Sequence, residues 1–271
     1  MNFLHIDDDK CVNCGQCSED CVTGAIAMGA DGPMLASDHC ISCGHCVAVC
    51  PVGALDNDHC PLENQVPSSG GSDPAPETLA LILRSRRSIR CYQDRAVPRP
   101  LVEKLLDMAR FAPTGGNTQG ISFLALDDRK ALDRISEATI EWMEDEIAKG
   151  SEHARFMDNF SARYRKEGRN VILWGAPCLV IADADTARLL PNARENAIFS
   201  LFHAQLYATG LGLGTCWAGA VEGAVASGHP AMTEVLKPYG ITKFVGALMV
   251  GYPKYQYHRF VDRDPLRLSW G

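Results

Sequence analysis

The sequence lacks the features of membrane, secreted and nucleic-acid-binding proteins. No apolar stretch in its 271 residues approaches the length of a membrane span. The first six residues have neither the basic flank nor the apolar run of a signal peptide, and three aspartates follow them. Arginine is concentrated in one short segment, which a site described below explains better than nucleic acid does. We therefore expect a cytoplasmic protein with reduced thiols and with neither a membrane nor a nucleic-acid partner.

Basic residues are almost absent from the first sixty positions. This region holds nine acids and one lysine, whereas the remainder holds 24 acids and 25 bases. An acidic face could steer docking to a basic partner, or it could serve solubility alone, and both interpretations stay open. The apolar content of 46% and the chain length allow one or two globular domains.

Cysteine, in contrast, is abundant near the amino terminus, where eight residues form two copies of the spacing C-x2-C-x2-C-x3-C. The copies lie twenty-nine residues apart: Cys11, Cys14, Cys17 and Cys21, then Cys40, Cys43, Cys46 and Cys50. This spacing ligates a pair of [4Fe–4S] clusters, with the fourth cysteine of each run crossing to the other cluster. The predicted ligand sets are therefore Cys11, Cys14, Cys17 and Cys50, and Cys40, Cys43, Cys46 and Cys21.

Two other uses of cysteine explain this pattern less well. A zinc site needs two C-x-x-C pairs and would leave four cysteines over, and a disulfide framework needs an oxidising compartment. The first sixty residues resemble the bacterial-type two-cluster ferredoxins. Pro51 follows Cys50 as in that family, but Val22 replaces the proline after Cys21, which we expect to change local rigidity and not cluster identity. Such clusters move single electrons, so the pattern predicts redox chemistry.

A stretch rich in proline, glycine and serine after Cys60 marks a linker. We expect a ferredoxin-type domain at residues 1–60, a linker at 61–76 and a second domain at 77–271. Hydrophobic periodicity in the second domain predicts a helix that starts at Asp73 and Pro74 and runs towards Ile89. Further helices are predicted at 100–111, 130–149, 153–174 and 192–209, and strands at 121–126, 178–182, 215–217 and 244–250. Helices and strands do not alternate strictly, which favours an α+β fold with a central sheet.

Four short elements of this second domain suggest a second site. Six arginines and one acid lie between residues 84 and 99. Taken alone, this segment fits a phosphate-binding site and a solvated helix face equally well. The loop at 112–120 combines glycines with two side-chain amides. The glycine-rich segment at 210–219 follows a helix and enters a strand, which reverses the order of a dinucleotide fingerprint. The fourth element is residues 251–253, with Arg259 and Arg263 in the tail.

Together these elements resemble the nitroreductase-like FMN flavoproteins over residues 77–271. The resemblance implies a homodimer of α+β sandwich subunits, each with a mixed central sheet, and FMN at the subunit interface. Arg86, Arg87 and Ser88 match the phosphate-binding segment, and Arg90 matches a basic position near the flavin ring. The implied loop contacts, usually made to the partner's flavin, are Pro113, Thr114, Gly115, Asn117 and Gln119. The implied ring segment is Trp217, Ala218 and Gly219, with the Gly219 N–H at flavin N5, and Arg259 or Arg263 would complete the phosphate site.

One departure from the family pattern leaves the substrate class open. Many relatives continue the amide loop with proline and tryptophan, where this chain has Gly120 and Ile121. Residues 130–170 are expected to shape the substrate entrance, and no acid–base residue is identified. Of the remaining cysteines, Cys178 and Cys216 lie in apolar strands and are expected in the core.

The two halves together predict an FMN-dependent oxidoreductase that receives electrons through two [4Fe–4S] clusters. It would reduce a small organic acceptor such as a nitroaromatic or a quinone. A ferredoxin-type donor is favoured over NAD(P)H, because a ferredoxin domain is already attached. Two alternatives stay open: an electron-transfer module for a protein partner, and a dehydrogenase whose electrons drain through the clusters.

Overall fold

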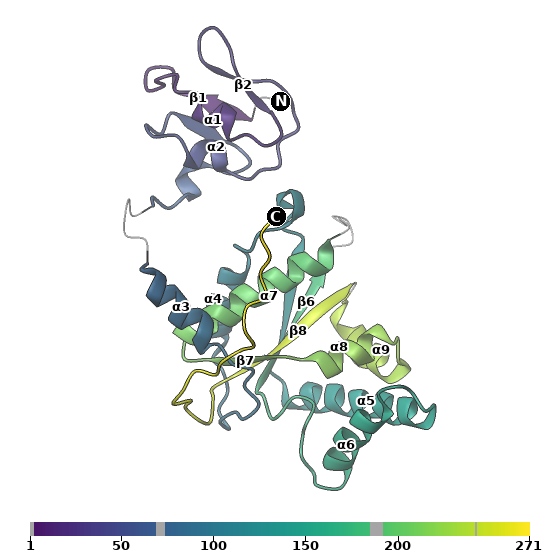
Figure 1. Cartoon of the computed structure of the whole chain (residues 1–271). Coiled ribbons are helices and arrows are strands. Elements are labelled where there is room, and N and C mark those ends of the chain that lie inside the picture. Colours follow the sequence, from purple (N-terminus) through teal and green to yellow (C-terminus); the bar gives the residue numbers. More distant parts are fainter. Residues whose placement is uncertain (1–2, 69–73, 185–191, 242) are drawn as a thin grey trace. The chain divides into compact units, whose positions relative to one another are not determined.

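The protein folds as two compact units, which are described here separately. The structure is a computed structural model that describes residues 3–68, 74–184, 192–241 and 243–271 (Figure 1). Unit 1 comprises Met1–Asp73 with Gly116–Thr118, and unit 2 comprises Pro74–Gly115 with Gln119–Gly271. Asp73, the predicted helix start, lies outside the described residues, as does part of the predicted linker.

Unit 1 consists of two halves that repeat each other at an offset of twenty-nine residues. The first half contains β1 (Leu4–Ile6), α1 (Gln16–Glu19) and β2 (Ile26–Met28). The second contains β3 (Pro33–Leu35), α2 (His45–Ala48) and β4 (Leu55–Asn57), and a 3-10 turn, η1 (Leu62–Asn64), follows. Strand β1 pairs antiparallel with β4, and β2 with β3, so each small sheet takes one strand from each half. The sequence repeat is therefore also a structural repeat.

The core of unit 1 is small and consists partly of cysteine. Its buried members are Phe3, Leu4, Cys17, Ile26, Ala54 and Leu55, and five further cysteines pack against them half-buried. A core of this size seldom stabilises a domain without a metal or covalent cross-links. The fold of unit 1 thus itself favours a bound inorganic group.

Unit 2 is built on one four-stranded sheet with the strand order β5-β6-β8-β7. The strands are β5 (Ile121–Leu126), β6 (Cys178–Ala184), β7 (Gly214–Trp217) and β8 (Phe244–Gly251). All three pairs of neighbours are antiparallel, and Ser88 adds a parallel bridge to Thr215 of β7. Strands β6 and β8 are buried along nearly their whole length, which explains why both read as continuous apolar runs in the sequence.

Helices cover both faces of this sheet. They are α3 (Pro76–Ser85), α4 (Arg99–Ala109), α5 (Arg129–Ala148), α6 (Ala154–Arg165), α7 (Ala193–Gly210), α8 (Gly219–Ala226) and α9 (Pro230–Leu236), with 3-10 turns η2 (Gly115–Asn117) and η4 (Lys237–Tyr239). Alternate residues of β6 point to opposite cores: Leu179 and Ile181 pack with α5, α8 and α9, whereas Val180 packs with α4 and α7. This layered arrangement confirms the predicted α+β class.

Three details of the sequence-based prediction were wrong. The helix expected at 153–174 ends at Arg165, because Gly168 takes a positive φ of 64° and Asn170 Oδ1 then accepts the N–H groups of Ile172 and Leu173. The first helix stops at Ser85 and does not approach Ile89, whose N–H donates to the Thr215 carbonyl instead.

The third detail concerns the buried face of α4, for which the apolar spacing in residues 100–111 predicts Leu101, Leu105, Met108 and Ala109. Leu105 and Ala109 are buried as the periodicity indicates, but Val102 is buried and Leu101 and Met108 are only half-buried. Helix α3 has no buried residue, and the three residues whose spacing predicts its apolar face, Leu79, Ile82 and Leu83, are 46%, 38% and 54% exposed. Within the described residues of unit 2, this face is only partly covered.

Two glycines on either side of the α7–β7 turn provide a test of this packing. A Cβ on Gly214 would lie 2.6 Å from Ile89 Cγ1 and 2.9 Å from Pro253 Cγ, whereas a Cβ on Gly210 would meet nothing within 4 Å. We expect Gly214→Ala to lower the free energy of unfolding by about 1–3 kcal/mol through overpacking. Gly210→Ala, at the end of α7, should leave it unchanged or raise it slightly, because alanine favours helix. Urea denaturation measures both, and equal midpoints for the two variants would contradict this packing.

Candidate functional site

The eight cysteines of the repeated motif surround two separate cavities in unit 1. One cavity is lined by Cys11, Cys14, Cys17 and Cys50 together with Asn13, Gly15 and other neighbours. The other is lined by Cys21, Cys40, Cys43 and Cys46. In each case the fourth cysteine comes from the other half, because β1 pairs with β4 and β2 with β3. The structure therefore groups the thiols in two crossed sets of four.

The arrangement of these thiols fits an extended inorganic cage better than a single ion. Within the described residues, no three cysteine, histidine or acidic side chains converge closely enough to hold one metal ion. A tetrahedral zinc site requires all four sulfurs within about 2.3 Å of one point, whereas a cluster spreads them around a cavity. The grouping of four thiols around each cavity suits two clusters.

Backbone N–H groups point at several of these sulfurs. Ala54 donates to Cys50 Sγ at 3.2 Å, and Ser42 donates to Cys40 Sγ at 3.3 Å. Burial acts to raise the pKa of the Cys50 thiol, but the surrounding N–H groups outweigh it and hold that pKa below its ordinary value. At Cys21, burial likewise acts to raise the pKa, while the Thr23 hydroxyl and nearby N–H groups lower it overall. A lowered pKa favours the thiolate, which is the form that binds iron.

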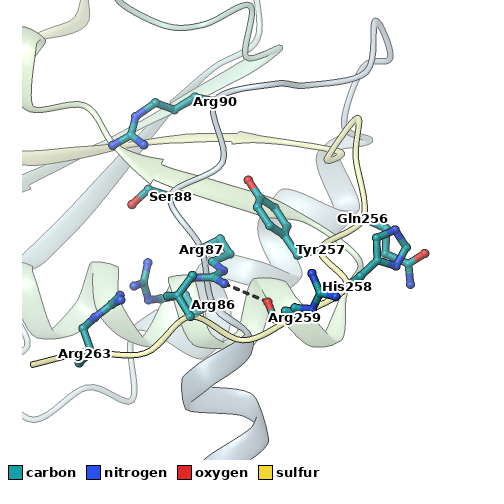
Figure 2. A pocket seen from close by; sticks show the side chains of 10 residues that line it. Arg86, Arg87, Ser88, Arg90, Gln256, Tyr257, His258, Arg259 and Arg263 are labelled. Atoms are coloured by element: carbon teal, nitrogen blue, oxygen red, sulfur yellow. Dashed lines mark hydrogen bonds between the residues drawn. The ribbon is translucent and has the colours of Figure 1, made fainter.

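A strongly basic cavity of about 580 Å³ lies in unit 2, between the segment after α3 and the carboxyl-terminal tail (Figure 2). It is lined by Arg86, Arg87, Ser88, Arg90, Gln256, Tyr257, His258, Arg259, Val261 and Arg263. Five of these residues are arginines, and none of the lining residues is acidic. Guanidinium groups bind phosphate through paired hydrogen bonds, and a serine hydroxyl adds another donor. The cavity is therefore suited to a phosphate dianion.

The arginines of this cavity have different roles. Arg87 Nη2 donates to the Arg259 carbonyl at 3.2 Å, and its guanidinium lies 5.3 Å from the centre of the Tyr257 ring. Arg87 therefore fastens the tail to the rest of unit 2. Arg86 Nη1 reaches Gln205 Oε1 on α7 at 3.5 Å, and both Arg259 and Arg263 line the cavity from the tail.

An apolar cavity of about 480 Å³ shares one residue, Arg90, with the basic cavity. Its other lining residues are Trp142, Met143, His153, Phe156, Met157, Phe160, Val171, Ile172, Trp174, Trp217, Ala218, Gly219, Ala220 and Met249. The indole of Trp217 is fixed by a 2.6 Å hydrogen bond from Nε1 to Glu222 Oε2, and Glu222 also pairs with Arg194. A planar ligand with an anionic tail could thus place its tail among the arginines and its ring against aromatic walls.

The amide loop lies between α4 and β5 and has a fixed local structure. Pro113, Thr114, Gly115 and Gln119 belong to unit 2, and Asn117 belongs to unit 1. The Gly115 N–H donates to Asn196 Oδ1 at 3.0 Å, and the Gln119 N–H donates to Thr114 Oγ1 at 3.1 Å. None of these five residues lines the basic or the apolar cavity of its own chain.

Sequence reasoning missed part of the basic cavity and part of the apolar cavity. Tail residues 256–258 and Val261 were not identified, because only the arginines of the tail stand out in the sequence. The aromatic walls were expected only as a region. The spacing of Phe156 and Phe160, four residues apart on α6, is the signal that could have identified them.

The cysteines outside the repeated motif should differ sharply in reactivity. Burial raises the pKa of the Cys178 thiol to about 12, whereas Cys91 is exposed. The thiolate is the nucleophile, so Cys178 should be almost entirely protonated, and unreactive, until the pH approaches 12. We expect iodoacetamide at pH 8 to label Cys91 in the folded protein and to leave Cys178 unlabelled, as read by peptide mass spectrometry. Cys91→Ser provides the control, and rapid labelling of Cys178 would show that β6 is not buried.

Comparison with known proteins agrees with this division of the chain. Residues 4–56 match the model of a 4Fe-4S dicluster domain. A protein of Archaeoglobus fulgidus, named as a candidate NADH dehydrogenase/NAD(P)H nitroreductase, is 42% identical over 57 residues. That stretch covers 21% of this chain and only 33% of the relative's own length. Within the described residues, no helix combines the length and apolar character needed to cross a membrane.

Solved structures share the fold of the second unit. A nitroreductase with bound FMN from Desulfitobacterium hafniense has a TM-score of 0.57 and 20% identity, and the match covers 71% of this chain and 98% of that one. A nitroreductase with bound FMN from Bacteroides fragilis gives a TM-score of 0.55 at 20% identity, with the same coverage. The family model described as the nitroreductase family matches residues 83–252. This match spans well over half of the 271 residues and confirms the resemblance noted in the sequence, so the chain belongs to the nitroreductase family.

Proposed function

We propose that the chain is an FMN-dependent oxidoreductase that receives electrons through two [4Fe–4S] clusters and reduces a small organic acceptor. One observation carries this proposal. The same chain contains two cavities that are each lined by four cysteines, and it also contains the basic cavity and the apolar cavity, which share Arg90. Residues 1–60 form the cluster domain, 61–76 the linker and 77–271 the flavin domain.

The clusters are held by the two crossed cysteine sets. One set is Cys11, Cys14, Cys17 and Cys50, and the other is Cys21, Cys40, Cys43 and Cys46. When bound, the clusters supply single-electron chemistry. The protein contributes thiolates whose charge is balanced by nearby N–H donors, such as those of Ser42 and Ala54. The small core of unit 1 would gain its stability from this ligation.

The basic cavity is proposed to hold the phosphate of FMN, and the apolar cavity is proposed to lie next to its ring. The residues assigned to the phosphate are Arg86, Arg87, Ser88, Arg259 and Arg263. Arg90 lines both cavities, so its positive charge would favour an anionic ring. Gly219 would present its N–H to the ring beside Trp217 and Ala218. When bound, the flavin supplies the hydride and electron chemistry, while the protein binds, orients and excludes water.

A second copy of this chain is proposed to complete the site. The loop residues Pro113, Thr114, Gly115, Asn117 and Gln119 line neither cavity of their own chain, which suits contacts to a partner's flavin. Helix α3 leaves an apolar face largely uncovered, with Leu79 46%, Ile82 38% and Leu83 54% exposed. Exposed apolar faces of this kind mark interfaces. The sedimentation of the FMN-loaded protein tests this point, since a monomer would contradict it.

The proposed acceptor is a nitroaromatic, a quinone or a related unsaturated compound. The apolar cavity has room for a small planar molecule, and aromatic side chains such as Phe156, Phe160 and Trp174 form its walls. An electron-transfer module with a protein partner would not require such a cavity, so the cavity favours the enzyme over that alternative. We propose a ferredoxin-type donor because the attached cluster domain provides an entry for single electrons, and NAD(P)H serves as the comparison donor.

Anaerobic purification followed by metal, sulfide and flavin analysis tests the central proposal. Eight irons and one FMN per chain are expected, with turnover of nitroaromatics or quinones supported by reduced ferredoxin or dithionite. A colourless protein, or a reduced flavin that no acceptor reoxidises, would refute the proposal. Activity with NAD(P)H as strong as that with ferredoxin would refute the choice of donor alone.

The phosphate site is tested by Arg86→Ala. A hydrogen bond to a charged group contributes about 1.5–3 kcal/mol, so loss of this guanidinium should raise the Kd for FMN by at least tenfold. Arg134→Ala is the matched control, because Arg134 is an exposed arginine on α5 that lines neither cavity, and it should leave the Kd unchanged. Fluorescence titration of the flavin-free protein with FMN measures both. Equal affinities for the two variants would place the phosphate elsewhere.

The role of the clusters as the electron entry is tested by Cys14→Ser. This variant should lose flavin reduction by a ferredoxin donor, because Cys14 lines the first cysteine cavity. FMN should stay bound, since the proposed phosphate and ring contacts belong to unit 2. Cys60→Ser is the control, because Cys60 lines neither cysteine cavity. Stopped-flow absorbance of the flavin measures the rate, and unchanged delivery in Cys14→Ser would show that unit 1 is not the entry.

A further inference from the structure

The two halves of unit 1 differ at the last residue of their equivalent strands β2 and β4. This residue is Met28 in the first half and Asn57 in the second, at the same offset of twenty-nine as the cysteines. Met28 is 41% exposed, whereas Asn57 is 1% exposed. A buried side-chain amide therefore stands where the other half has a thioether.

The Asn57 amide is directed at the sulfurs of the second cysteine cavity, which it also lines. Its Nδ2 lies 3.9 Å from Cys46 Sγ and 4.0 Å from Cys40 Sγ. Its Oδ1 accepts the N–H of His59 at 2.9 Å. Because the oxygen is occupied by that backbone donor, the amide cannot rotate, and both of its N–H groups remain on the sulfur side.

The first cavity has no such donor at the equivalent position. The Cγ of Met28 lies 4.0 Å from where a Cβ on Gly15 would stand, and Gly15 lines that cavity. A thioether carries no N–H and can only accept weakly. At this pair of equivalent positions, the second cavity therefore has a buried amide donor and the first has none.

One-electron reduction adds a single negative charge, which is spread over the cluster and the sulfurs around it. Hydrogen-bond donors to those sulfurs stabilise the reduced form more than the oxidised form, and so raise the reduction potential. We propose that Asn57 raises the potential of the cluster held by Cys21, Cys40, Cys43 and Cys46 above that of the other cluster. Electrons that enter the protein therefore reside first on this cluster. This inference rests on the two-cluster assignment in the proposed function.

The experiment is an anaerobic dithionite titration of the full-length protein, followed by electron paramagnetic resonance. The native protein should show two separate one-electron steps. Asn57→Leu removes the donors and should lower the upper step by roughly tenfold in the reduction equilibrium, which is about 59 mV for one electron, with the lower step unchanged. Asn57→Asp keeps an acceptor for His59 but has no N–H and adds a charge, so it should lower the upper step further.

Matched variants connect each step with its cavity. Met28→Leu should leave both steps unchanged, and Met28→Asn should raise the lower one. The step that moves in the Asn57 variants should be the one altered by Cys43→Ser and not the one altered by Cys14→Ser. The Asp variant keeps the test valid if the Leu variant fails to fold.

Iron analysis separates this inference from the proposed function. Fewer than eight irons per chain in the native protein would refute the two-cluster assignment and this inference with it. Eight irons, with both steps unmoved in Asn57→Leu and Asn57→Asp, would refute only the role of Asn57. A shift confined to the step altered by Cys14→Ser would also refute it, because Asn57 would then act on the other cluster.

Discussion

The exchange of strands between the two halves of unit 1 is the constraint on which the rest depends. Each half pairs its strands with those of the other half, so Cys50 is carried to the first three cysteines of the first run and Cys21 to those of the second. Neither half could surround a cavity with four thiols by itself. The two cysteine cavities therefore form together or not at all, and any change that weakens one strand pair should disturb both sites.

Pairing between distant segments also positions the basic cavity of unit 2. The N–H of Ile89 donates to the Thr215 carbonyl, and Ser88 bridges β7 in parallel, so the arginines after α3 are held beside the edge of the sheet. On the other side, Arg87 fastens the tail through the Arg259 carbonyl. The basic cavity is thus assembled from segments about 170 residues apart in the chain. Gly214 has no side chain where Ile89 and Pro253 approach it, which permits this close packing.

The sequence predicted the parts of this arrangement that local chemistry determines. Ligand spacing is imposed by cluster geometry, so the cysteine sets could be assigned from their spacing alone, and β6 and β8 stand out because strands buried on both faces are continuously apolar. The end of α6 could not be predicted, since it depends on the left-handed conformation at Gly168 and on the Asn170 side chain. The aromatic walls come from α5, α6, β7 and the loop before β6, and nothing in the local sequence links them. The repeat in the sequence aligns Asn57 with Met28, but it does not show that the Asn57 amide is directed at the sulfurs of Cys40 and Cys46.

Both units follow one electrostatic rule. Donors gather where reduction would add negative charge. The N–H groups of Ser42, Ala54 and Asn57 lie at the sulfurs, and the Arg90 side chain lines both the basic and the apolar cavity of unit 2. The buried N–H groups of Ala54 and Asn57 stabilise an electron more strongly in their low-dielectric surrounding than they would in water, whereas Arg90 is exposed. The backbone donors come from segments present in both halves, whereas the Asn57 amide has no counterpart at Met28. Among the side chains near the cysteine sulfurs, the buried Asn57 amide is directed at two sulfurs of one set and can give two repeated cages different affinities for an electron.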